Sequence, residues 1–305
     1  MDPESEERPC CNLSKKVKIW LGILCVLVVV AIVVVVVVVV VIPKFGRAHT
    51  HKRWNGRPTT PHFPEIVLGR CYTYTQIKRP ELRQKDCQEI VKAFQNAFLS
   101  KDPCSSREKD YQPLMDLTSQ TIPCSKVVLW SKSSELVHQY TRVQREMFTL
   151  EDTLLGYMAD GLTWCGDAGS SDMNYQSCPD WRKDCRNNTV SVFWEAVSRR
   201  FAKNACGTVQ VVLNGSNSNT FDKNSTFGRV EIYNLRPEKA PTLQAWVMRD
   251  LEGPPSHTCS SSLINDLKLI LEKKNITFTC QDDYRPLRLL QCVTNPEHPS
   301  CRSVM

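Results

Sequence analysis

An uninterrupted apolar run, 19–42, constrains the chain more than any other feature of its sequence. The run holds 24 residues without a charge, nine of them consecutive valines from Val33 to Val41, and Pro43 ends it. As a helix rising about 1.5 Å per residue, it would be about 36 Å long and could cross a hydrocarbon core of about 30 Å. It exceeds the apolar region of about 7–15 residues in a cleaved signal peptide. It therefore predicts a transmembrane signal anchor following a cytoplasmic tail, 1–18.

Cysteines and glycosylation acceptors indicate which side of the membrane the C-terminal portion occupies. Of the 15 cysteines, 12 lie after Pro43, an even number typical of disulfides formed in an oxidising compartment. Basic residues flank the anchor on both sides, so they do not decide its orientation. The same portion contains four Asn-x-Ser/Thr acceptors, Asn187, Asn214, Asn224 and Asn275. Together these features predict a single-pass type II protein of the cell membrane, with residues 43–305 outside the cell.

The charge and the histidines argue against two common classes of partner. The net charge of +7 is mild for 305 residues and is not gathered into a basic stripe, so we expect no nucleic acid partner. The six histidines are scattered and no Cys-x2-Cys pair occurs, so we expect no metal site. A mild positive charge suits an anionic small substrate.

The ectodomain alternates between predicted strands and helices. We expect a stalk over 43–64 and an extracellular domain over 65–305, with a helical part (65–123 and 149–205) and an α/β part (124–148 and 206–305). Strands are predicted at 126–130, 209–213, 229–235, 243–248 and 276–280, with helices between them. This order indicates a mixed α/β (α+β) fold with a parallel sheet beside a helical subdomain. A cleft between the two parts is the expected ligand site.

Acids, hydroxyls and aromatics are the groups left to carry any chemistry, because the common nucleotide-loop, nucleophile-elbow and zinc-helix motifs are absent from the sequence. Taken alone, Glu151 and Asp152 fit the first turn of a helix, where acids stabilise the N-terminus. Trp194 fits an apolar core face, and Glu231 fits the solvent side of a strand. Trp130 is more suggestive, because ligands gather at the carboxyl ends of parallel strands.

Several motifs that occur in order along the chain favour functional roles for these residues. They are Trp130-Ser-Lys, Thr149-Leu-Glu-Asp-Thr-Leu-Leu-Gly, Cys178-Pro-Asp-Trp, Val192-Phe-Trp-x-x-Val-Ser-Arg-Arg-Phe and Asn224-Ser-Thr-Phe-Gly-x-Val-Glu. With the anchor and the 12 cysteines, the chain resembles the ADP-ribosyl cyclase/cyclic ADP-ribose hydrolase family over 65–305, and most of all its mammalian lymphocyte-surface, type II membrane member.

The resemblance implies roles for individual residues. Glu231 would be the catalytic glutamate, stabilising the oxocarbenium-like ribose formed when the nicotinamide–ribose bond of NAD breaks. Trp130 and Trp194 would flank the reacting nucleotide, and Glu151 and Asp160 would hold the nicotinamide end. The remaining predicted substrate-binding residues are Ser131, Lys132, Asp152, Ser198, Ser225, Thr226 and Phe227. Lys132 stands where the family pattern leads us to expect an arginine, which would bind phosphate through two parallel bonds.

A disulfide pattern also follows from the resemblance, since spacing alone leaves the connectivity open. The family pattern pairs Cys71–Cys87, Cys104–Cys185, Cys124–Cys206, Cys165–Cys178, Cys259–Cys280 and Cys292–Cys301. The Cys124–Cys206 pair resembles that of members able to hydrolyse cyclic ADP-ribose, so we expect it to be linked to activity.

The implied function is that of an ectoenzyme. It would convert NAD mainly to ADP-ribose and in minor part to cyclic ADP-ribose, hydrolyse cyclic ADP-ribose, release nicotinamide and exchange the base of NADP. NAD and NADP are substrates, and no cofactor is expected. Such an enzyme can also form a homodimer or engage a cell-surface protein ligand. The alternative is a non-catalytic, disulfide-rich surface receptor on the same scaffold, which would leave the coincidence of Glu231, Trp130 and Trp194 unexplained.

Overall fold

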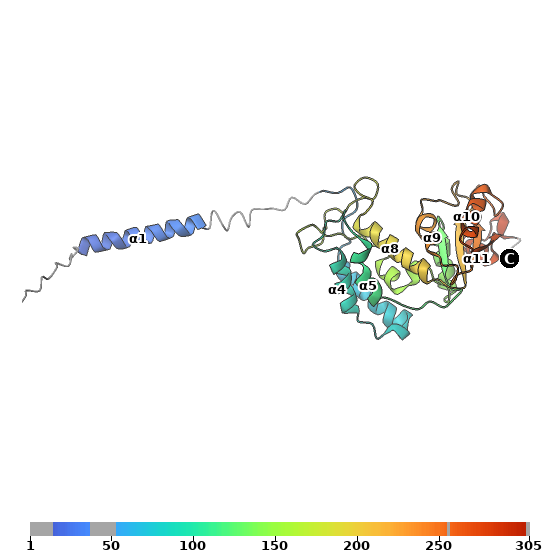
Figure 1. The fold of residues 1–305 in the computed structure, drawn as a ribbon, viewed down its shortest axis with the longest axis horizontal. Coiled ribbons are helices and arrows are strands. Elements are labelled where there is room, and N and C mark those ends of the chain that lie inside the picture. The colour runs from blue at the N-terminus through green and yellow to red at the C-terminus, as the bar shows by residue number, and fades with distance from the viewer. Residues whose placement is uncertain (1–14, 37–52, 255–256, 303–305) are drawn as a thin grey trace, which may run out of the picture. The chain divides into compact units, whose positions relative to one another are not determined.

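The computed structural model describes residues 15–36, 53–254 and 257–302 (Figure 1). The chain divides into an N-terminal unit ending at Lys52 and a second unit beginning at Arg53. In the first unit, helix α1 spans Lys15–Val36. The predicted anchor continues to residue 42, and its last six positions lie outside the described residues, as do most of the predicted tail and the first part of the predicted stalk. Within the described ranges, no helix combines the length and the apolarity required to cross a membrane.

The second unit is built on a parallel sheet, as predicted. Its four strands are β1 (Val128–Ser131), β2 (Thr208–Asn214), β3 (Thr242–Met248) and β4 (Thr277–Asp282), in the spatial order β1-β2-β3-β4. All three pairings are parallel, and Val212 of β2 lies between Trp130 of β1 and Trp246 of β3. All four carboxyl ends therefore lie at one edge of the sheet, which is the usual ligand side of such folds.

Both faces of the central strands are buried, which explains why β2 reads as a continuous apolar run. Val209, Val211 and Leu213 belong to the main core, which also receives residues of α8 and α10. Val212 points to the opposite face and joins Trp246 in a second apolar cluster with residues of α6 and α11. Helices thus cover both faces of the sheet, and the helical and sheet segments share the main core.

The helices connect these strands and form the rest of the unit (Figure 1). Their bounds are α3 Phe63–Tyr72, α4 Cys87–Phe98, α5 Gln112–Leu117, α6 Ser134–Val143, α7 Leu154–Ala159, α8 Thr189–Asn204, α9 Ile232–Asn234, α10 Ser262–Glu272 and α11 Arg285–Thr294. Short helical turns of other types lie at Thr73–Lys78, Pro80–Leu82, Glu108–Asp110, Leu150–Asp152, Phe227–Glu231 and Pro299–Cys301. The amphipathic helix α4 buries Ile90, Phe94 and Phe98, as its spacing predicts.

The strand predicted at 229–235 is wrong. The structure has a π-helical turn at Phe227–Glu231 followed by α9, Ile232–Asn234. Ser225 starts this turn, because its hydroxyl accepts a hydrogen bond from Gly228 N at 3.0 Å. Gly228 lies so close to the Asp222 carbonyl that a Cβ would meet that oxygen at 2.3 Å. In a strand Val230 and Glu231 would face opposite sides, whereas the helical turn buries both of them.

Two segments pack more extensively than their sequence suggests. Residues 53–64, predicted as the end of the stalk, belong to the folded unit, where Trp54 and Thr59 are buried. Helix α11 after β4 has no counterpart in the sequence prediction. Pro286 in its first turn and the apolar pair Leu287 and Leu290 are the signals that could have found it.

All six predicted disulfides are present. The structure joins Cys71–Cys87, Cys104–Cys185, Cys124–Cys206, Cys165–Cys178, Cys259–Cys280 and Cys292–Cys301. Cys124 and Cys206 are 82 residues apart, and their bond ties the segment before β1 to the segment before β2. The link between this bond and activity remains a prediction.

Candidate active site

A cavity of about 800 Å³ opens at the carboxyl edge of the sheet. Its walls come from β1, from helices α6 and α8, and from the helical turns at Leu150–Asp152 and Phe227–Glu231. The segments 160–163, after α7, and 225–226, in the loop after β2, also contribute to them. Of the predicted site residues, the cavity is lined by Trp130, Ser131, Lys132, Glu151, Asp160, Trp194, Ser198, Ser225, Thr226, Phe227 and Glu231. The fold therefore gathers eleven residues that span a hundred positions of the sequence around one volume of nucleotide size.

Glu231 is the buried acid of this cavity. Glu231 is 7% exposed, and the pKa of its carboxyl is raised to about 8, with burial as the main cause. The negative charge of Glu151 contributes to this rise, while the hydrogen bond with Ser198 opposes it. No cation forms an ion pair with Glu231 in the described part of the chain. The site therefore holds an acid that is biased toward its neutral form, and a bound cationic group would stabilise its ionised form.

Glu151 is held by two aromatic neighbours. Its Oε2 accepts a hydrogen bond from Trp130 Nε1 at 3.4 Å and lies 3.4 Å from His138 Nε2. Burial is the largest influence on Glu151 and opposes its ionisation, but the bond with His138, the charge of His138 and the bonds with the backbone and Thr149 together outweigh burial and lower the pKa of Glu151. The bond with Glu151 raises the pKa of His138. Glu151 is therefore the ionised acid of the pair with Glu231, and Glu231 is the one biased toward its neutral form.

Helix α8 supplies one wall of the cavity. Its N-cap Asn188 accepts a hydrogen bond from Ser191 N, which fixes the register of the helix. Trp194 and Ser198 lie four positions apart and so share a face, which carries both toward the cavity. The Trp194 ring is supported edge-on by Phe193, with ring centroids 5.1 Å apart. Trp130 and Trp194 are both partly exposed, so each presents indole surface to the cavity.

Polar groups gather where Lys132 meets the loop before the π-helical turn. The Lys132 ammonium lies 3.7 Å from a carboxylate oxygen of Asp222, and the Lys132 side chain is half exposed. Ser225 and Thr226 line the same side of the cavity. A cation beside two hydroxyls suits a phosphate group, although lysine lacks the bidentate geometry of arginine.

Asp152 has a structural role in the described chain, and its predicted contact with substrate stays a prediction. It does not line the cavity. Its carboxylate accepts hydrogen bonds from the backbone N and the hydroxyl of Thr149, both at 3.0 Å. This is the capping role that its position in a first helical turn favours.

Sequence reasoning missed several residues of the cavity. His138 had no motif to distinguish it, although its place on α6, whose first residues line the cavity, could have suggested a polar role. Arg57 and Thr163 also line the cavity, and both come from segments read as stalk or loop. Among the described residues, no group of three His, Cys, Asp or Glu side chains is arranged to hold a metal ion.

The predicted glycosylation acceptors differ in their surroundings. Asn187, Asn224 and Asn275 are exposed, whereas Asn214 is partly buried at the end of β2. The Asn214 amide donates hydrogen bonds to Asp250 at 3.1 Å and to the Lys132 carbonyl at 3.3 Å.

Known proteins resemble this chain along most of its length. A sequence family described as ADP-ribosyl cyclase matches residues 60–301. The mouse protein named ADP-ribosyl cyclase/cyclic ADP-ribose hydrolase 1 is 56% identical over 98% of this chain and 96% of its own length. A porcine CD38 structure with a covalent intermediate, ribo-F-ribose-5′-phosphate, is 61% identical, covering 76% of this chain and all of that chain with a TM-score of 0.73.

The similarity extends to a distant relative. A structure of Aplysia cyclase, complexed with substrate NGD and product cGDPR, is 30% identical and covers 80% of this chain and 98% of that chain, with a TM-score of 0.74. The family match covers well over half of the sequence and both structures share the fold. The chain belongs to the ADP-ribosyl cyclase family.

Proposed function

We propose that this chain is an enzyme that cleaves the nicotinamide–ribose bond of NAD. The observation that carries the proposal is Glu231, a buried carboxyl without a cationic partner among the described residues, in a cavity whose walls include Trp130 and Trp194. A chain that only bound ligands would gain nothing from an uncompensated buried acid, which costs stability. Membership of the family and the relatives named as cyclases and hydrolases support the same assignment.

The cleavage needs little beyond charge stabilisation. The C1′–N bond breaks, its electron pair stays with the pyridine nitrogen, and nicotinamide leaves as a neutral molecule. Positive charge then develops on the ribose, where the Glu231 carboxylate stabilises it by charge or by a covalent bond. Trp130 and Trp194 offer indole faces to the flat pyridinium of the substrate, a contact worth about 0.5–2 kcal/mol.

The raised pKa of Glu231 fits this substrate. With a pKa of about 8, the free carboxyl is largely protonated at neutral pH. The nicotinamide ring of NAD carries a positive charge, and an opposite charge nearby lowers the pKa of a carboxyl. Binding of NAD would therefore favour the ionised form that the reaction requires, and a neutral ligand would not.

Product identity depends on what captures the ribosyl group. Water gives ADP-ribose, the adenine of the same substrate gives cyclic ADP-ribose, and nicotinic acid gives base exchange on NADP. Since both indoles are partly exposed, water has access, and we infer that ADP-ribose is the main product and cyclic ADP-ribose a minor one. Cyclic ADP-ribose would re-enter the same cavity for hydrolysis, with the Cys124–Cys206 bond present.

The full chain in detergent, incubated with NAD and then with cyclic ADP-ribose, tests the proposal when products are separated by chromatography. We expect nicotinamide and ADP-ribose from the first substrate and ADP-ribose from the second. Intact NAD in the presence of the folded chain would overturn the proposal and favour a non-catalytic surface receptor.

We also propose that residues 19–42 anchor the chain in the cell membrane, with the catalytic unit outside. The charge-free run and the 12 cysteines after it support this orientation. Protease added to intact cells should remove the catalytic unit, and endoglycosidase should increase its gel mobility if acceptors such as Asn187 carry sugars. A catalytic unit that resists protease until the cells are permeabilised would show the opposite orientation.

A further inference from the structure

The segment 54–60 is a fixed part of the cavity wall. Gly56 N donates to the Cys178 carbonyl at 2.8 Å, and Cys178 N donates to the Arg57 carbonyl at 3.0 Å. A Cβ on Gly56 would meet the Cys178 oxygen at 2.5 Å, so this close approach requires glycine. Three residues further on, Thr60 N donates to the Thr163 carbonyl at 2.8 Å. The backbone that carries Arg57 is therefore held on both sides.

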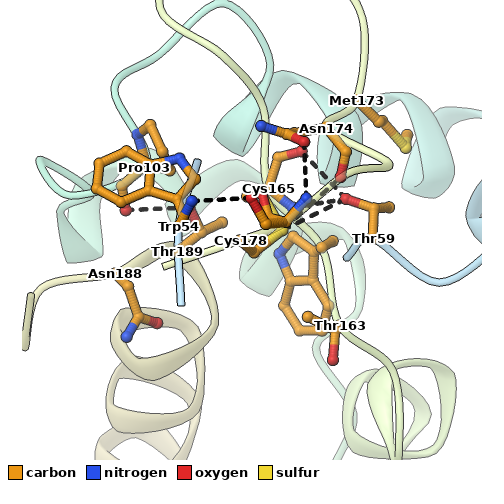
Figure 2. Close-up of a disulfide and its surroundings, with 12 residues drawn as sticks. Trp54, Thr59, Pro103, Thr163, Cys165, Met173, Asn174, Cys178, Asn188 and Thr189 are labelled. Carbon is orange, nitrogen blue, oxygen red and sulfur yellow. Dashed lines mark hydrogen bonds between the residues drawn. A yellow bond between two sulfur atoms is a disulfide. The ribbon is translucent and has the colours of Figure 1, made fainter. Parts of the chain in front are cut away.

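The Cys165–Cys178 disulfide secures this attachment. Figure 2 shows Trp54 and Thr59 beside the disulfide, with Asn174 and Thr163 around them. The Thr59 hydroxyl accepts a hydrogen bond from Cys165 N at 3.1 Å, and Trp54 N donates to the Ser177 hydroxyl at 2.8 Å. Trp54 and Thr59 are both buried. Arg57 thus projects from a braced segment, although its own side chain is exposed.

Arg57 adds a positive charge to the cavity wall, on the segment that is bonded to Thr163 through Thr60. Arg57, Thr163, Asp160 and Glu151 all line the cavity, and the two acids are the ones that the family resemblance assigns to the nicotinamide end. In the described part of the chain, neither the Arg57 guanidinium nor the Asp160 carboxylate takes part in an ion pair. Lys132, the other cation lining the cavity, lies near Asp222 with the hydroxyls of Ser225 and Thr226. Lys132 therefore has an acidic neighbour, Asp222, whereas Arg57 has no ion-pair partner among the described residues.

These charges bear on which base can enter during exchange. Nicotinamide is neutral, whereas nicotinic acid carries a carboxylate at the same ring position. Glu151 and Asp160 alone would repel that carboxylate, and a guanidinium attracts it through two parallel hydrogen bonds. We propose that Arg57 is a specificity residue that favours nicotinic acid over neutral bases in the exchange reaction, an inference that rests on the proposed function.

The exchange step balances without another reactant. The C1′–N bond to nicotinamide breaks and its electron pair leaves with the nicotinamide nitrogen. The lone pair of the nicotinic acid ring nitrogen then forms the new C1′–N bond. The carboxylate takes no part in bond making, so a residue that binds it changes the choice of base and not the chemistry at C1′.

Two acceptors of the same size provide the test. Full chains of wild type and of the Arg57→Ala, Arg57→Lys and Arg57→Glu variants are incubated with NADP and either nicotinic acid or isotopically labelled nicotinamide. The readout is the ratio of the two exchange rates. We expect Arg57→Ala to lower the nicotinic acid to nicotinamide ratio about five- to tenfold, since one charge-assisted contact at an exposed site is lost. Arg57→Glu should lower it more, and Arg57→Lys should restore part of it.

Arg83→Ala is the matched control, because Arg83 is exposed and lies outside the cavity. It removes the same charge from the chain and should leave the ratio at the wild-type value. An equal loss of both exchange rates in Arg57→Ala, or an unchanged ratio in Arg57→Glu, would overturn the inference. A wild type that leaves NADP intact would instead overturn the proposed function, and the inference with it.

Discussion

Two carboxyl groups of this fold, one partly buried and one buried, have opposite electrostatic surroundings. At the junction of β3 and α11, Asp283 accepts hydrogen bonds from Arg249 and Arg288, and Arg288 is 6% exposed. Burial alone would raise the pKa of Asp283, but the bond from Arg249 and the charge of Arg288 lower it. In the cavity, Glu231 has the Ser198 hydroxyl and a second acid nearby, and its pKa rises to about 8. At the junction, the ionised Asp283 pairs with two arginines and so stabilises the position of α11. In the cavity, Glu231 has no cationic partner among the described residues and can interact with a cationic ligand.

Replacing the uncompensated acid should have the largest effect on activity. We expect Glu231→Gln to lower NAD turnover by about 10³-fold or more, because the carboxylate opposite the developing ribosyl charge is lost while the side chain keeps its shape. Turnover is measured by nicotinamide release, with circular dichroism to confirm the fold. Turnover near the wild-type rate in a folded variant would remove Glu231 from this role.

The same substitution should affect stability in the direction opposite to activity. The folded pKa of about 8 exceeds the ordinary glutamate pKa of 4.5, so the folded chain holds an extra proton between these values. Wild-type stability therefore falls as the pH rises through this window, and Glu231→Gln should not share that loss. Melting temperatures at pH 5 and pH 8 test this. The advantage of the variant over wild type should be larger at pH 8, and a larger advantage at pH 5 would contradict the pKa assignment.

Breaking the compensated cluster should mainly change stability. Asp283→Asn leaves the nearly buried Arg288 without its anionic partner, and we expect a loss of about 2–4 kcal/mol in the free energy of unfolding. Asn is the matched choice because Asp283 has φ of 48°, a conformation that asparagine tolerates. Denaturant unfolding measures the loss, with Asp266→Asn on the exposed Lys223 pair as the control. An equal, small loss in both variants would mean that the cluster contributes little.

The charge of Glu151 should move the pH dependence of the cavity. It is the largest charge effect on Glu231 and raises its pKa, so Glu151→Gln should shift the acid limb of kcat/KM to lower pH. We expect a shift of about one pH unit, in line with two carboxylates sharing a site. The pH profile of nicotinamide release provides the measurement. Glu146→Gln, which neutralises an exposed acid paired with Lys126, should leave the limb in place.

Local patterns were sufficient for much of this fold. Alternating apolar runs and helices predicted the parallel sheet, and β2 appears within one residue of its predicted ends. The strand predicted at 229–235 failed because local turn contacts set the backbone there, and hydrophobic alternation does not register such contacts. The alternation around Glu231 is typical of a strand, yet the close approach of Gly228 to Asp222 and the Ser225 hydrogen bond make it helical.

The candidate site depended less on periodicity than on resemblance. No spacing rule brings Trp130, Trp194 and Glu231 together, because three different connections of the fold place them around the cavity. Asp152 shows the complementary case, since its capping role follows from its place in a first turn and the structure has it there. Arg57 was hidden because its segment is polar and proline-bearing, and its attachment requires a disulfide loop more than a hundred residues later.

Removing the Ser198 hydroxyl should cause the smallest change in the pH dependence of kcat/KM, in the direction opposite to that of Glu151→Gln. Among the described residues, Ser198 is the group that lowers the pKa of Glu231, by a hydrogen bond that favours the ionised form. Ser198→Ala should therefore shift the acid limb of kcat/KM to higher pH, by less than Glu151→Gln shifts it down, because the Ser198 contribution ranks below that of Glu151. Parallel pH profiles of the two variants and their double mutant measure both shifts. A double mutant lying between the single variants would show that the two neighbours act on the same proton, as the geometry around Glu231 requires. Shifts in the same direction would mean that the proton lost in the acid limb belongs to another group.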